Sequence, residues 1–94
     1  MSYNILDYSE PLVVQKLANK YLGKNADVYL STRKNKKYMI QNPDGKWIHF
    51  GAYTYEDFTK HKDDKRRENF RKRNAKWANA PKWSAAWLAY NLLW

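Results

Sequence analysis

Apolar positions near the start of the chain recur with the spacing of an amphipathic helix. Val13, Leu17 and Tyr21 follow one another at intervals of four, which places them on one helical face. The residues between them are mostly polar, as expected for a surface helix that packs through one stripe. The pattern predicts a packing helix over residues 9–23.

Capping residues mark both ends of this predicted helix. Ser9 has the side chain of an N-cap, and Gly23 is of the type that ends helices. The segment before Ser9 shows no periodicity, so we expect residues 1–8 to form a flexible arm.

Residues 27–50 carry the shorter periodicity of β-strands. Asn42-Pro43-Asp44-Gly45 is a strong turn signal between the last two strand segments. Alternation places Ile48 and Phe50 on one face and Trp47 on the other. The segment predicts a three-stranded antiparallel meander.

The second half of the chain is predicted to be helical. A long helix is expected over residues 54–76, with Thr54 as its cap, and it should lie on the surface because few of its middle residues are apolar. Ser84 is the expected cap of a short last helix over residues 83–93. Together these elements predict a single α+β domain spanning residues 1–94.

Composition adds a strong positive charge to this picture. Lys and Arg number 18 against 9 Asp and Glu, giving a net charge of +9. Residues 60–76 hold nine Lys or Arg and three acids, so this stretch carries much of the excess. Such a helix suits phosphates or an acidic protein surface, and a merely solvated helix is the alternative. The candidate binding residues are Lys62, Lys65, Arg66, Arg67, Arg71, Lys72, Arg73 and Lys76, with a second cluster at Arg33, Lys34, Lys36 and Lys37.

Aromatic residues make up 17% of the chain and gather in the predicted last helix. Four of them share one face at helical spacing, and they are candidate docking residues: Trp83, Trp87, Tyr90 and Trp94. Packing on the meander, docking into a partner and contact with an anionic membrane surface are three alternatives for this face. The stretch is too short to span a bilayer, so no transmembrane segment is expected.

The chain offers little for catalysis. It has no cysteine, and His49 and His61 lack the H-x-x-x-H or H-E-x-x-H spacing of metal sites. Its three glycines form no phosphate-binding loop. We therefore expect a protein that is not an enzyme and needs no cofactor or metal.

Two segments carry a resemblance to a known family. The first is the hairpin K-Y-M-I-Q-N-P-D-G-K-W-I-H-F-G from Lys37, and the second is Y-E-D-F-T-K-H-K-D-D-K-R-R from Tyr55. Together with the final L-L-W, they resemble short basic proteins of large nucleocytoplasmic DNA viruses of algae and protists. Those proteins share a K-W-x-H-F-G hairpin followed by Y-E-D-F-T-x-H-x-D-x-x-R-R.

The resemblance implies a context more than an activity. It implies a virion protein, assembled in the host cytoplasm, whose partners are viral coat proteins or other virion components. The first hypothesis is therefore a minor capsid or assembly protein that docks through aromatic anchors and a cationic helix. The alternative is a sequence-independent DNA- or RNA-binding protein packaged with the viral genome.

Overall fold

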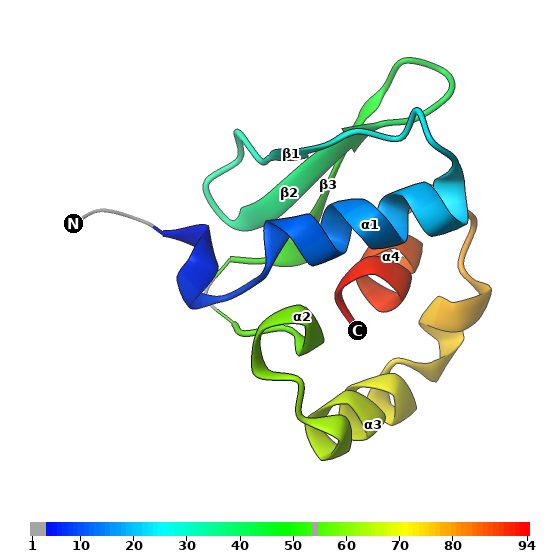
Figure 1. The fold of residues 1–94 in the computed structure, drawn as a ribbon. Helices are drawn as coiled ribbons and strands as arrows, with labels where there is room; N and C mark the ends of the chain where they lie inside the picture. Colours follow the sequence, from blue (N-terminus) through cyan, green and yellow to red (C-terminus); the bar gives the residue numbers. More distant parts are fainter. Residues whose placement is uncertain (1–3, 54) are drawn as a thin grey trace.

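The computed structural model describes residues 4–53 and 55–94 and shows an α+β fold (Figure 1). The sheet and helices are connected by short turns, and two 3₁₀ segments and one π-helical segment supplement the α-helices. In chain order the elements are η1 (Ile5–Asp7), α1 (Pro11–Leu22), β1 (Val28–Leu30), β2 (Lys36–Gln41), β3 (Trp47–Ala52), α2 (Phe58–His61), α3 (Asp64–Arg73), η2 (Ala75–Asn79), α4 (Ala85–Leu88) and η3 (Ala89–Leu93).

The three strands form an antiparallel sheet in the order β1-β2-β3, which confirms the predicted meander. The turn between β2 and β3 is stabilised by Asn42, whose side-chain Oδ1 accepts hydrogen bonds from the main-chain N–H groups of Asp44 and Lys46. Gly45 takes a φ of +85° there, which L side chains rarely adopt. The local sequence thus determines this hairpin directly.

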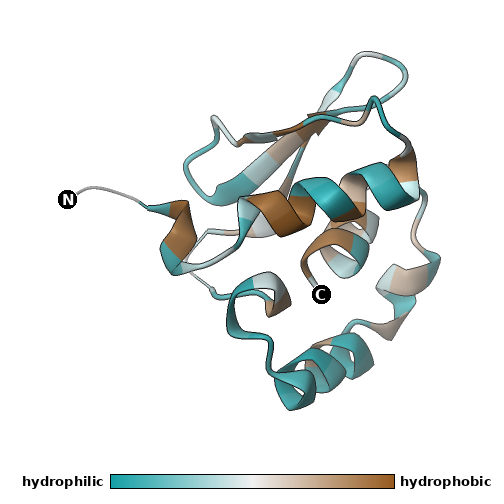
Figure 2. Ribbon diagram, in the orientation of Figure 1, coloured by the Kyte–Doolittle hydropathy of each residue, from teal (hydrophilic) through white to brown (hydrophobic). Residues whose placement is uncertain are grey.

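The core lies on one face of the sheet. Tyr38, Ile40 and Phe50 project from β2 and β3 into it and are fully or almost fully buried. α1 and the α4–η3 segment cover this face (Figure 1), and Figure 2 shows that both carry apolar residues. The removal of this apolar surface from water is the main force that holds the layers together.

α1 is present, but its buried stripe is not the predicted one. Val14 and Ala18 are fully buried, whereas Leu12 is 81% exposed and Tyr21 is 40% exposed. The helix is therefore turned by about one residue relative to the Val13 stripe. A small residue such as Ala18 allows the helix to approach the sheet closely. The hydrophobic pattern alone does not identify such a small residue as a buried position.

The predicted arm is ordered over its described part. Residues 1–3 lie outside the described residues, and η1 buries Ile5 against the core. Ser9 is not an N-cap, because Glu10 occupies that position and Ser9 is buried. The expectation of a flexible segment is wrong from Asn4 onward, since Ile5, an isolated apolar residue, gains burial in the core.

The expectation of a single long helix over residues 54–76 is also wrong. α2 ends at His61, because Lys62 adopts a left-handed conformation with φ 54° and ψ 29°. Asp63 then caps α3, its side chain accepting hydrogen bonds from the main-chain N–H groups of Lys65 and Arg66. The expected cap at residue 54 lies outside the described residues.

The last helix begins as predicted, with Ser84 accepting a hydrogen bond from the main-chain N–H of Trp87. Four residues later the α-helix changes to the wider π-helical η3. This change shifts the angular positions of the residues that follow. The one-face arrangement expected from a regular helix is consequently lost before Trp94.

Candidate functional site

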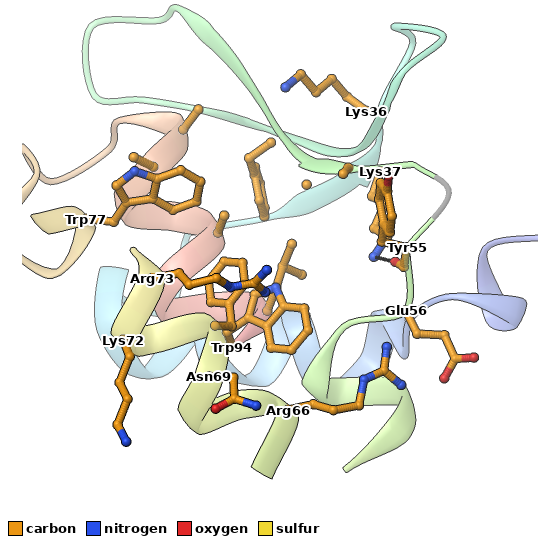
Figure 3. Close-up of a pocket in the computed structure, with 18 residues that line it drawn as sticks. Lys36, Lys37, Tyr55, Glu56, Arg66, Asn69, Lys72, Arg73, Trp77 and Trp94 are labelled. Atoms are coloured by element: carbon orange, nitrogen blue, oxygen red, sulfur yellow. Dashed lines mark hydrogen bonds between the residues drawn. The ribbon is translucent and has the colours of Figure 1, made fainter. Parts of the chain in front are cut away.

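A pocket of about 950 Å³ lies between α3, β3 and α4 (Figure 3). Most of its lining is a cationic rim and an apolar floor, and Glu56 and Asn69 also line it. The lining residues on which the site depends are Lys36, Arg66, Asn69, Phe70, Arg73 and Trp77.

The rim of the pocket is mostly cationic. Arg66, Lys72 and Arg73 come from α3, and Lys36 comes from the start of β2. Figure 3 shows Arg73 reaching into the pocket while Lys72 extends away from it. Lys72 also forms an exposed ion pair with Glu68 at 3.0 Å, a type of contact that contributes little to stability. Arg66 and Arg73 are therefore the rim cations best placed to meet an anion.

The floor and one wall are aromatic and aliphatic. Phe70 of α3 stacks on Trp94, with ring centroids 4.3 Å apart and planes 7° from parallel. Trp77 of η2 meets Phe70 edge-on at 5.8 Å. Its half-buried indole borders the pocket, which Leu93 also lines. These side chains would exclude water from a ligand's apolar part.

Arg67 and Arg71, both predicted to bind a polyanion, have internal partners instead. The Nε of Arg67 and a terminal nitrogen of Arg71 donate hydrogen bonds to the main-chain oxygen of Trp94, at 2.6 and 2.8 Å. Their guanidinium groups also lie over aromatic rings, Arg67 over Phe58 and Arg71 over Tyr90. These two arginines hold α3 against the last segment of the chain.

Lys37 is the clearest correction to the predicted binding set. It is only 2% exposed, and its Nζ lies 3.1 Å from the Oδ2 of Asp57, which is also buried. The ammonium group donates to the main-chain oxygen of Tyr55 as well. Burial lowers the pKa of Lys37, and the Asp57 carboxylate opposes that shift. The predicted surface cation is thus an internal structural residue.

A buried hydrogen-bond network surrounds this ion pair. The Asp57 carboxylate accepts a hydrogen bond from the Thr59 hydroxyl, which lies 3.1 Å from that of Ser9. Ser9 accepts from the Tyr38 hydroxyl at 2.6 Å. The network joins the start of α1, β2 and the entry to α2. Sequence patterns gave no sign of it, because each of these residues had an ordinary local explanation.

The other predicted cations lie on the surface. Arg33 and Lys34 are exposed in the turn before β2, and Lys62, Lys65 and Lys76 are exposed around α3 but do not line the pocket. Lys36 is half-buried and does line it. The structure therefore brings only part of the predicted cationic set together at one site.

The four predicted docking aromatics are half-buried and do not form one exposed face. Trp87 packs edge-on against Tyr21 at 6.2 Å, and Tyr90 lies under Arg71. Trp83 packs at the margin of the core. Packing within the chain thus accounts for much of this aromatic surface.

The histidines lie in separate environments. His49 Nδ1 is 2.7 Å from the Ser31 hydroxyl, and His61 lies 5.1 Å from the Trp94 ring. Burial lowers the pKa of both histidines, and neighbouring cations lower it further. Among the described residues no cluster of three or more potential metal-ligating side chains is found.

The fold and pocket define a small α+β domain with a cationic, aromatic-lined cavity. Residues 26–74 match the family of unknown function DUF5754, and because this match covers just over half of the chain, the protein belongs to that family. The matched region includes the pocket residues of β2, β3 and α3 but not those of η2 and α4. Searches of the curated proteins and of the solved structures found no significant match. No helix within residues 4–53 and 55–94 is long and apolar enough to cross a membrane.

Proposed function

We propose that this protein is a non-enzymatic nucleic-acid-binding protein that contacts phosphates through the exposed cations of α3. The observation that carries the proposal is the set of exposed cations there. All ten α3 residues are described, and none is buried. Arg67 and Arg71 are half-buried against Trp94, whereas the other charged side chains of α3 are exposed. Arg66 and Arg73 flank the pocket, and Lys65 extends the charged surface. Cations along one helix suit successive phosphates better than a single small anion.

The setting of the proposal comes from the resemblance to proteins of large DNA viruses. A basic protein packaged with a viral genome would bind without sequence preference, through phosphates. The net charge of +9 supports this type of binding.

The test is a fluorescence-anisotropy titration of labelled DNA at two salt concentrations. We expect affinity to fall steeply with salt, with a logarithmic slope of about −0.9 for each phosphate contact on duplex DNA. The double variant Arg66→Glu/Arg73→Glu should weaken binding at least about tenfold. Lys16→Glu/Lys24→Glu is the matched control, since it changes the net charge equally at exposed positions outside the pocket. No binding at near-physiological salt, or equal losses in both double variants, would contradict the proposal.

A second candidate function is docking to an acidic viral coat protein. It is favoured by the outer face of the sheet, where Tyr29 is 50% exposed and Trp47 is 41% exposed. Tyr29 and Trp47 meet edge-on at 5.7 Å, and the turn that follows β1 carries the exposed Arg33 and Lys34. Aromatic side chains beside cations are common at protein interfaces. Loss of particle incorporation in Tyr29→Ser/Trp47→Ser, with DNA binding unchanged, would favour this function over the first.

A further inference from the structure

The pocket beside α3 has a feature that phosphate binding alone does not require. A helix that only contacts phosphates needs exposed cations, yet this one borders an apolar pocket of about 950 Å³. The pocket is large enough for a flat heterocycle and the sugar attached to it. An apolar cavity next to cations fits a ligand that has an apolar face and a negative charge close to it.

We propose that this pocket binds an unstacked base of a single-stranded nucleic acid, with the neighbouring phosphates on the cationic rim. The inference rests on the proposed function and deepens it by naming the form of nucleic acid. In a duplex the bases are stacked and paired, so only phosphates and groove edges are available to the protein. In a single strand a base can turn outward and place its ring against aromatic side chains.

The positions of the lining residues fit the two parts of such a ligand. Trp77 supplies a half-buried indole at one wall, and the stacked pair of Phe70 and Trp94 lies next to it. Arg73 reaches into the pocket from the end of α3, and Arg66 lies near the start of the same helix (Figure 3). The two arginines are seven residues apart, about 10 Å along a helix, so they can meet different phosphates of one strand.

One polar residue of the pocket could contact a base edge. Asn69 is exposed on α3 and lines the pocket between the two arginines. Its amide can both donate and accept hydrogen bonds, as base edges do. The pocket therefore combines a ring-binding wall, charges for phosphate and a group for the base edge.

The experiment compares three labelled probes with equal numbers of phosphates per strand. They are a single strand of about 16 nucleotides, a strand of the same length with abasic residues, and the duplex of the first strand. We expect the intact single strand to bind about tenfold more tightly than the abasic strand, because the latter keeps its phosphates and lacks every base. A poly-glutamate peptide and vesicles containing anionic lipid complete the set.

Two variants test the pocket itself. Ala85→Leu places a larger side chain in the pocket from an exposed position of α4, and it should reduce binding of the intact strand to the level of the abasic strand. Ala78→Leu is the matched control at an exposed position that does not line the pocket, and it should bind like the unaltered protein. Trp77→Ala should act like Ala85→Leu, with its folded state checked by circular dichroism.

The outcomes separate the inference from the proposed function. Equal affinity for intact and abasic strands, or tighter binding of the duplex, would overturn the pocket inference while phosphate binding stands. Binding of poly-glutamate or anionic vesicles with none of the nucleic acids would overturn both. A tenfold preference for the intact strand that Ala85→Leu abolishes and Ala78→Leu keeps would establish the base site.

Discussion

At the scale of single residues, the fold depends on the buried contact between Lys37 and Asp57. Both side chains are almost fully removed from solvent, and their charged groups are 3.1 Å apart. A buried pair of this kind need not stabilise a protein more than apolar residues would, but removal of one partner leaves an uncompensated charge. The contact therefore constrains which substitutions are tolerated at both positions.

Lys37→Met should destabilise the protein by about 3–5 kcal/mol, because the Asp57 carboxylate would remain buried without its counterion. The double variant Lys37→Met/Asp57→Leu should recover much of this loss, since neither charge remains. Thr59 would keep its contacts with Ser9 and with the main-chain N–H of Glu10 in the double variant. Urea denaturation of the two variants and the unaltered protein measures both effects. A double variant no more stable than the single one would contradict this account.

His61 should make the stability depend on pH. Its Nδ1 accepts a hydrogen bond from the main-chain N–H of Asp63 at 2.9 Å, which requires the neutral ring. Burial, and secondarily Arg66, lower the pKa of His61 in the folded state. The unfolded state consequently binds more protons below about pH 6.5, so the free energy of unfolding should fall as the pH drops through that value.

Denaturation at pH 7.5 and at pH 5.5 tests this expectation. His61→Asn keeps a hydrogen-bond acceptor near the Nδ1 position but does not titrate, so it should lose less stability between the two pH values. His49 also has a lowered pKa and should account for part of the remaining loss. An equal loss in the unaltered protein and in His61→Asn would exclude this role for His61.

At the scale of elements, sequence patterns predicted the hairpin best, because its turn is determined locally by Asn42 and Gly45. The break after α2 was signalled by Asp63, a good N-cap, but the continuous helical composition around it concealed that signal. The pocket could be predicted only in part. Its cations were visible in the charge pattern, whereas the inward direction of Arg67 and Arg71 depends on the position of Trp94.

Gly51, the second-last residue of β3, should tolerate no larger residue. Its φ is +87°, and a Cβ there would lie 2.8 Å from the Cδ1 of Leu93 and 3.2 Å from the Cβ of Lys37. Gly51→Ala combines backbone strain with a steric clash and should destabilise the fold by about 2–4 kcal/mol. Gly23→Ala is the control, with a φ of +105° and no atom within 4 Å of the added Cβ. It should cost only the backbone part, about 1–2 kcal/mol. Equal thermal destabilisation of the two variants would contradict a role for the contact with Leu93.

At the scale of the whole molecule, the fold consists of a packed unit and a more weakly attached one. α1 and the α4–η3 segment pack on the sheet, while α3 lies farther from it (Figure 1). α3 contributes no buried residue and is held by contacts of Phe70, Arg67 and Arg71 with Trp94. These few contacts also position one wall of the pocket.

α3 should therefore open locally at a lower free energy than the sheet, since local stability follows the number of buried apolar contacts. Arg67→Gln/Arg71→Gln removes both charged hydrogen bonds to Trp94 and should speed amide hydrogen exchange over residues 64–73 several-fold. Exchange in β2 and β3 should stay unchanged, because their core contacts remain. Lys65→Gln/Lys72→Gln is the control with the same charge change at exposed positions of the helix, and it should leave exchange in α3 nearly as it was. A uniform increase across α3 and the sheet in the arginine variant would mean that the chain opens as one cooperative unit, and the pocket wall would then be as rigid as the core.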